Sequence, residues 1–83
     1  MKTVEIYTWS YCPYCIKAKN ILETEKIDYI EYEISDDKSK LHDLKLKSGS
    51  GTVPQIFVNG EFIGGCDDLV NLKKLDKIDQ IFK

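Results

Sequence analysis

Arginine is absent from this 83-residue sequence, and all 12 basic residues are lysines. An anionic ligand must therefore be held by ammonium groups, backbone amides or hydroxyls, because no guanidinium group is present to bind it in two places at once. The 14 acidic residues are mixed among the lysines, and the net charge is −2. A nucleic-acid-binding surface needs a concentrated basic patch, so we expect no nucleic acid among the partners.

Long apolar runs are also lacking. The first residues, MKTVEIYT, alternate in polarity. No stretch reaches the roughly 18 consecutive apolar residues of a membrane-spanning helix. We therefore expect no signal peptide, no membrane contact and a cytoplasmic location. The length predicts one small domain, residues 1–83.

Cysteine is scarce and odd in number, with only Cys12, Cys15 and Cys66. An odd count fits a secreted disulfide framework poorly. The close pair in SYCPYC could bind a metal, form a structural disulfide or carry out redox chemistry. Tetrahedral zinc needs four ligands, and only Cys66 and His42, at irregular spacing, could complete such a site. In a reducing cytosol a structural disulfide is also disfavoured. We therefore favour redox chemistry and expect no metal.

Hydrophobic periodicity predicts the elements of structure. Alternating residues favour strands at 3–8, 28–34, 55–58 and 61–63. Apolar stripes favour helices at 13–26, with Pro13 in the first turn, and around 41–46, ended by the glycines of SGSG. A last helix is expected from Asp67 or Asp68 through residue 75, with an apolar face continuing to the C-terminus.

The resulting order, β-α-β-α-β-β-α, predicts an α/β fold with a four-stranded mixed sheet flanked by helices. Two strands joined through a helix suggest a parallel pair with a right-handed crossover. Asn59-Gly60 is a strong hairpin signal and adds an antiparallel pair. A CxxC pair between the first strand and its helix is the signature of a thioredoxin-like fold.

The Cys12-Pro13-Tyr14-Cys15 segment suits disulfide exchange, in which the thiolate is the nucleophile. At a helix N-terminus, Cys12 lies near the positive end of the helix dipole and near unpaired N–H groups. The i, i+3 spacing puts Cys15 at the same end of the helix, one turn further in and more buried. We therefore expect Cys12 to attack and Cys15 to resolve the mixed disulfide.

Two later segments are candidates for binding a peptide. Thr52-Val53-Pro54 either starts a strand or, with a cis bond before Pro54, turns the Val53 backbone outward to pair with an extended ligand. GGCDD at 64–68 is either a turn and helix cap, or a set of amides for a carboxylate beside Asp67 for an amino group. Cys66 alone is expected to be a packed residue rather than a third redox thiol.

Four segments together resemble the glutaredoxin family, of the short bacterial dithiol type. They are YT before the active loop, CPYC at 12–15, TVPQIFVNG at 52–60 and GGCDDL at 64–69, and the resemblance covers essentially the whole chain. It implies a thioredoxin-like fold and an enzyme that uses glutathione as co-substrate, without a bound cofactor, to reduce protein disulfides and glutathione mixed disulfides. The implied partners are glutathione and disulfide-bearing or glutathionylated proteins, and we expect a monomer.

The resemblance also assigns roles to individual residues. It implies that Cys12 carries the glutathionyl group and that Cys15 resolves dithiol reactions. It implies that Tyr14 lies along the bound glutathione. The cysteinyl part of glutathione would contact Thr52, Val53 and Pro54. Its γ-glutamyl end would contact Cys66 and Asp67.

Three positions depart from the family pattern. Trp9 stands where the family commonly has a lysine, Gly51 stands where a basic residue often precedes Thr-Val-Pro, and Leu41 stands where relatives often have a glutamine. Lys17 and Lys45 are candidate replacements for the missing cations. Each exposed charge pair contributes only about 0.2–1 kcal/mol, so we expect weakened rather than abolished glutathione affinity.

Two alternative functions follow from the same residues. One is a glutaredoxin-like electron donor that is reduced by thioredoxin reductase, which the missing cations would suit. The other is an iron–sulfur cluster carrier in which two chains share a cluster through Cys12 and glutathione. Pro13 disfavours the second, because stiff proline-containing active loops in the family usually disfavour cluster assembly.

Overall fold

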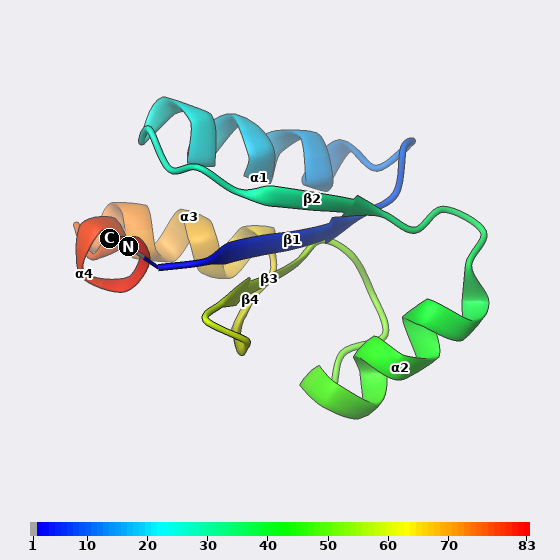
Figure 1. The fold of residues 1–83 in the computed structure, drawn as a ribbon. Coiled ribbons are helices and arrows are strands. Elements are labelled where there is room, and N and C mark those ends of the chain that lie inside the picture. Colours follow the sequence, from blue (N-terminus) through cyan, green and yellow to red (C-terminus); the bar gives the residue numbers. More distant parts are fainter. Residues whose placement is uncertain (1) are drawn as a thin grey trace.

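The structure, a computed structural model, describes residues 2–83 and confirms the α/β fold with a four-stranded mixed sheet (Figure 1). In that range the elements follow the predicted order, with one additional short helix at the end. They are β1 (Val4–Thr8), α1 (Pro13–Thr24), β2 (Ile30–Glu33), α2 (Lys38–Ser48), β3 (Gln55–Val58), β4 (Glu61–Gly64), α3 (Cys66–Lys74) and α4 (Ile78–Phe82).

The strand order is β2-β1-β3-β4. As predicted, β1 and β2 are parallel and are joined through α1, whereas β3 is antiparallel to both β1 and β4. Asn59 and Gly60 have φ angles of 51° and 81° and form the turn between β3 and β4. Positive φ at both central residues is the geometry for which Asn-Gly is preferred in a two-residue hairpin.

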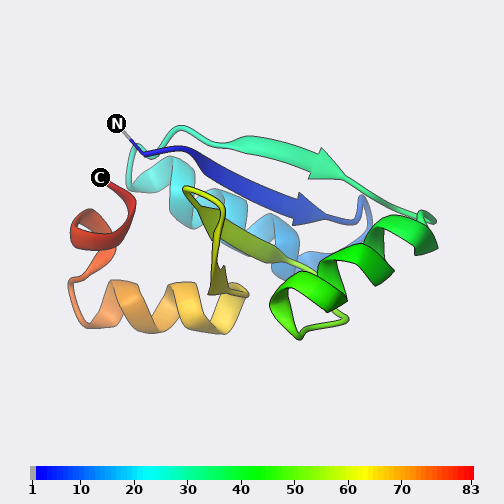
Figure 2. The same cartoon turned by 60° about the horizontal axis from the view of Figure 1, so that its bottom comes forward.

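Helices cover both faces of the sheet, but unequally (Figures 1 and 2). The larger core lies between the sheet and the helices α1, α3 and α4, and includes Ile6, Leu22 and Leu69. On the other face, α2 covers a smaller cluster around Phe57 and Leu44. All four residues of β3 are buried, because this strand lies inside the sheet with helices over both of its faces.

The apolar side of β2 is largely open to solvent. Ile30 and Tyr32 are 49% and 37% exposed, and Tyr32 stacks on Tyr7 with ring centroids 4.8 Å apart. The alternation in residues 28–34 therefore predicted a strand correctly but did not mark a buried face. The other side of β2 carries Glu31, which contacts Lys19 of α1.

The C-terminal helix differs from the prediction in its start and its continuity. Helix α3 begins at Cys66, with Gly65 as the N-cap, so Asp68 lies inside the first turn. Its carboxylate accepts a hydrogen bond of 2.9 Å from the Gly65 N–H and thus caps the helix from within. The chain then turns through Asp76, whose φ is 57°, before α4 returns Ile78 to the core.

Helix α2 has a defined start and end. Asp37 is the N-cap and accepts a 2.9 Å hydrogen bond from the Lys40 N–H, while Gly49 closes the helix in the left-handed conformation. Leu44 is buried and Leu46 is 75% exposed, so the apolar face of this helix is narrower than the sequence suggested. None of the helices between residues 2 and 83 is long and apolar enough to cross a membrane.

Candidate active site

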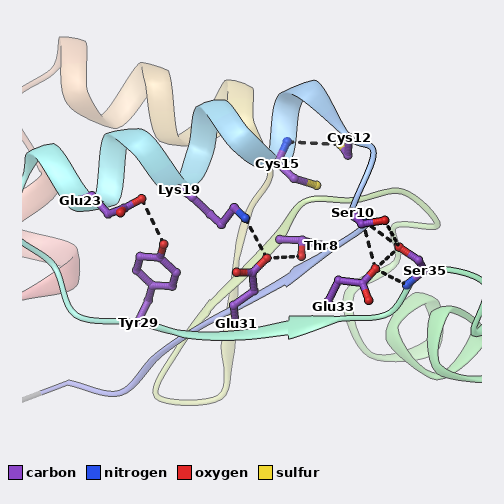
Figure 3. Close-up of polar contacts among 10 residues, drawn as sticks. All are labelled: Thr8, Ser10, Cys12, Cys15, Lys19, Glu23, Tyr29, Glu31, Glu33 and Ser35. Atoms are coloured by element: carbon purple, nitrogen blue, oxygen red, sulfur yellow. Dashed lines mark hydrogen bonds and ion pairs between the residues drawn. The ribbon is translucent and has the colours of Figure 1, made fainter.

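The two close cysteines lie where β1 passes into α1, and the local backbone places Cys12 at the helix N-terminus. Cys12 is the N-cap residue, in an extended conformation, and its N–H donates to the Trp9 carbonyl at 3.3 Å. The Cys12 Sγ atom accepts a hydrogen bond from the Cys15 N–H at 3.2 Å (Figure 3). The Cys12 sulfur thus lies at the helix N-terminus and faces a backbone donor.

Cys15 has a different environment one turn further along α1. It is 1% exposed against 8% for Cys12, as the sequence predicted. Burial, followed by the hydrogen bond with Cys12, raises the pKa of Cys15 to about 12, while the Trp9 backbone and the Lys19 charge oppose that rise. Cys15 is therefore a protonated thiol at neutral pH. The structure places the two thiols side by side, in unequal environments that suit an attacking and a resolving role.

Next to Cys12 lies a groove with a volume of about 370 Å³. Its lining comes from the start of α1, from the loop before β3, from β4 and from the start of α3. All six residues that the resemblance assigned to ligand binding are among those that line it: Tyr14, Ser50, Thr52, Val53, Pro54, Phe62, Gly65, Cys66, Asp67 and Asp68. The Cys12 thiol reaches this side of the molecule, with Sγ 3.9 Å from the Val53 carbonyl oxygen.

The loop before β3 is held by contacts that sequence reasoning did not identify. The cis Val53-Pro54 bond, by contrast, is one of the two alternatives that the sequence left open. The Gln55 side chain is fully buried and donates to the carbonyls of Ser50 and Thr52 at 2.7 and 2.9 Å. Across the groove, Gly65 approaches so closely that a Cβ there would lie 3.2 Å from the Pro54 carbonyl oxygen. The only sequence signal for Gln55 was a polar residue at the start of an apolar strand.

Cys66 lines the groove but also belongs to the larger core. It is 5% exposed, and burial raises the pKa of its thiol. This environment fits the expectation that Cys66 is a packed residue. His42, its partner in the hypothetical zinc site, is exposed on α2. Across residues 2–83, no group of three or more His, Cys, Asp or Glu side chains could hold a metal ion.

Two aromatic residues, Trp9 and Tyr11, precede Cys12 in the sequence but are not among the residues that line the groove. Trp9 is half-buried and stacks on the exposed Tyr11, with ring centroids 5.8 Å apart. Trp9 and Leu41 both pack against the smaller core under α2, so neither position offers a charge to the groove. At Gly51, however, the stem of Lys45 passes close by, 3.5 Å from where a Cβ would stand. Lys45 thus approaches the position where a basic residue often stands in the family pattern.

A polar cluster lies under α1, on the side of the helix that faces β2 (Figure 3). One oxygen of the Glu31 carboxylate accepts a 2.6 Å hydrogen bond from the Thr8 hydroxyl and lies 3.0 Å from the Lys19 ammonium nitrogen. Further along β2, Glu33 accepts a 3.1 Å hydrogen bond from the Ser10 N–H in the loop that leads to Cys12. Sequence patterns gave no sign of these contacts.

Comparison with known proteins agrees with this geometry. The family model described as glutaredoxin matches residues 4–63. Glutaredoxin 3 of Escherichia coli strain K12 is 41% identical over 83 residues, which cover 100% of both chains. The holo form of glutaredoxin C1 from Populus tremula x tremuloides has a TM-score of 0.90 at 30% identity, covering 95% of this chain and 81% of that one. A buckwheat glutaredoxin–glutathione complex has a TM-score of 0.87 at 26% identity, covering 98% and 76%.

Proposed function

Because the chain belongs to the glutaredoxin family and is a thiol–disulfide oxidoreductase with a thioredoxin-like fold, we propose that it reduces glutathione mixed disulfides and protein disulfides with electrons from glutathione. The observation that carries this proposal is the groove beside Cys12. It is lined by all six residues that the family resemblance assigns to glutathione, and one of the similar solved structures is a glutaredoxin–glutathione complex.

The reaction starts at Cys12. Its thiolate attacks the glutathione sulfur of a mixed disulfide, the bond to the substrate protein breaks, and the protein thiol is released with a proton from solvent. Glutathione then remains on Cys12. A second glutathione thiolate attacks that glutathionyl sulfur, which releases oxidised glutathione and regenerates Cys12. In this cycle the buried Cys15 thiol takes no part.

Protein disulfides need Cys15 as well. Cys12 first forms a mixed disulfide with the substrate protein, and Cys15 then loses its proton and attacks the Cys12 sulfur. The substrate leaves as a dithiol, and the Cys12–Cys15 disulfide that forms is reduced by two glutathione molecules. The high pKa of Cys15, about 12, keeps it protonated while Cys12 makes the first attack.

The groove offers complementary groups for an extended tripeptide. An exposed Tyr14 ring lies along one side, and the backbone of Val53 is adjacent to the Cys12 sulfur. At the far end, the α3 N-terminus presents backbone amides to the α-carboxylate of the γ-glutamyl group, and the Asp67 carboxylate faces its amino group. Glutathione thus binds with its sulfur directed to Cys12.

The test is the rate at which a glutathionylated peptide is reduced at varied glutathione concentration. We expect wild type and Cys15→Ser to turn over and Cys12→Ser to be inactive, because only Cys12 is needed for mixed disulfides. With a protein disulfide as substrate, Cys15→Ser should also fail. A wild type that stays inactive with glutathione but is reduced by thioredoxin reductase would overturn the proposal and select the reductase-fed donor instead.

A further inference from the structure

The Lys19 side chain shares a face of α1 with the resolving cysteine. Lys19 follows Cys15 by four residues, and residues at this spacing lie above one another on a helix. Both side chains extend from α1 toward the strands below it (Figure 3). Lys19 does not extend into solvent: its side chain is 26% exposed, and its ammonium lies 3.0 Å from the Glu31 carboxylate. A cation is therefore held on the side of the helix where Cys15 is buried.

Glu31 is also held in place by a residue of β1. The oxygen that contacts Lys19 also accepts the 2.6 Å hydrogen bond from Thr8, which is fully buried at the end of β1. One carboxylate oxygen thus joins β1, β2 and α1. The Thr8 hydroxyl and the Lys19 ammonium both lower the pKa of Glu31, so this carboxylate stays charged throughout the neutral range.

The neighbouring titratable groups are engaged elsewhere. Glu33 of β2 accepts hydrogen bonds from Ser10 and Ser35. Glu23 of α1 accepts one from the hydroxyl of Tyr29, which directly precedes β2. On the other side of Cys15 stands Cys12. The ion pair on the Cys15 face of α1 is therefore Lys19 with Glu31.

We propose that Lys19 and Glu31 are a positioning pair for the resolving cysteine: Glu31 fixes the Lys19 ammonium beside α1, and its negative charge limits how much of the Lys19 field reaches the Cys15 sulfur. Neither residue touches the reacting atoms, so both act through Cys15. The inference rests on the proposed function only for the role of Cys15, which attacks a mixed disulfide on Cys12. Without Lys19, Cys15 is harder to ionise; without the Glu31 charge, it is easier to ionise.

The resolving step can be followed without glutathione by using 5,5′-dithiobis(2-nitrobenzoate). The Cys12 thiolate cleaves the reagent, releases one coloured thionitrobenzoate anion and keeps the other as a mixed disulfide. Cys15 then loses its proton to buffer and attacks the Cys12 sulfur, which forms the Cys12–Cys15 disulfide and releases the second anion. Two electrons pass from the protein to the reagent. All proteins carry Cys66→Ala, so that only the two active-site thiols react.

The experiment compares the second phase of anion release in wild type, Lys19→Met and Glu31→Gln between pH 6 and 9. Glutamine keeps an oxygen that can accept from Thr8 and Lys19 but removes the charge. We expect Lys19→Met to displace the rate–pH profile to higher pH and Glu31→Gln to displace it to lower pH. A change of one pKa unit alters the thiolate fraction tenfold, but nucleophilicity falls with pKa, so each displacement should appear as roughly a threefold rate change per unit.

The first phase, which reports Cys12, serves as an internal control and should change less than the second. Lys74→Met removes the same charge from the last turn of α3, at the opposite end of that helix from the groove, and should leave the second phase unchanged. The proposal is overturned if Lys19→Met and Glu31→Gln both slow the second phase, since that is the mark of a merely structural contact, or if neither changes it. A protein that resolves normally here but never uses glutathione would count against the proposed function alone.

Discussion

Among single residues, Lys45 is the one best placed to replace a missing family cation. Trp9 and Gly51 stand where the family pattern has basic side chains, and the aliphatic part of the Lys45 side chain passes close to Gly51. An ammonium group there would attract the carboxylate of a bound glutathione. Because Lys45 is exposed, this attraction is screened and contributes about 0.2–1 kcal/mol.

We therefore expect Lys45→Gln to raise the KM for glutathione by roughly 1.5- to 5-fold, with little change in kcat. Steady-state kinetics with a glutathionylated peptide, at low and at high ionic strength, measures this effect, and added salt should weaken it. Lys74→Gln, which removes one lysine from the last turn of α3, is the matched control for net charge. Equal KM values for the two variants would contradict a specific role for Lys45.

The hydrogen bond from Thr8 to Glu31 affects the stability of the fold and its pH dependence. Its hydrogen bond is the main cause of the lowered pKa of Glu31, which lies below the ordinary value of 4.5. A carboxyl group with a lowered pKa contributes stability above its unfolded pKa and loses that contribution as the pH falls through its folded pKa. Thr8→Val keeps the shape of the buried side chain but removes the donor.

We expect Thr8→Val to lower the free energy of unfolding by about 1–2 kcal/mol at pH 7, with a smaller loss at an acidic pH low enough to protonate Glu31. Urea unfolding at both pH values measures the difference. Thr8→Ser, which keeps the hydroxyl, should retain the pH dependence of the wild type. If the loss caused by Thr8→Val is the same at both pH values, the charged hydrogen bond is not its source.

Among the elements, α3 has its start fixed by the Asp68 side chain. Asp68 caps the helix through the Gly65 N–H, and the helix start forms one wall of the groove. Asp68→Ala should destabilise the protein by about 1 kcal/mol, because the donor loses its partner. For a chain of this size that change lowers Tm by roughly 4–8 °C. Thermal unfolding measures it, and Asp68→Asn, which keeps an acceptor oxygen, should lose less.

Most elements could be predicted because their signals are local. Pro13 and the apolar stripe that follows it predicted a helix at 13–26, and α1 spans Pro13–Thr24. Asn59-Gly60 identified the hairpin because few other dipeptides tolerate positive φ at both positions. The break between α3 and α4 was missed. Ile78 and Phe82 return to the same core as α3, so the apolar pattern continues across a turn that only Asp76 marks.

The contacts that could not be predicted join elements that are distant in sequence. Thr8 and Glu31 are 23 residues apart, and no periodicity within β1 or β2 reveals that one donates to the other. Similarly, Gln55 read as an ordinary polar residue at a strand start, although its side chain holds the loop before β3. The groove residues were found in advance because recognisable segments carry them, not because their convergence was visible in the sequence.

At the scale of the whole molecule, Phe57 of β3 packs between the sheet and α2. It is 1% exposed on the inner strand β3, packs edge-on against Tyr7 with ring centroids 5.6 Å apart, and lies 5.4 Å from the Phe62 ring of β4. Together with Leu44 it anchors α2 to the sheet. Because this second core has few fully buried residues, loss of the Phe57 ring should weaken it strongly.

Phe57→Ala should cost about 3–5 kcal/mol, from lost burial and the cavity left behind. Native proteins have a free energy of unfolding of only about 5–15 kcal/mol, so Phe57→Ala would remove a large part of it. Denaturant unfolding measures the loss. The control is Leu46→Ala on the exposed side of α2, which should stay within about 0.5 kcal/mol of wild type. Similar losses for both variants would show that Phe57 has no special place in the core.

The position of Trp9 gives the molecule an optical property. It is the sole tryptophan in the sequence, its carbonyl accepts from the Cys12 N–H, and its ring stacks on Tyr11. Indole emission is quenched by a disulfide nearby and recovers when the sulfur atoms are reduced. The fluorescence of the unlabelled protein should therefore follow the state of its cysteines in real time, so that the reaction can be watched without dye, tag or coupled enzyme.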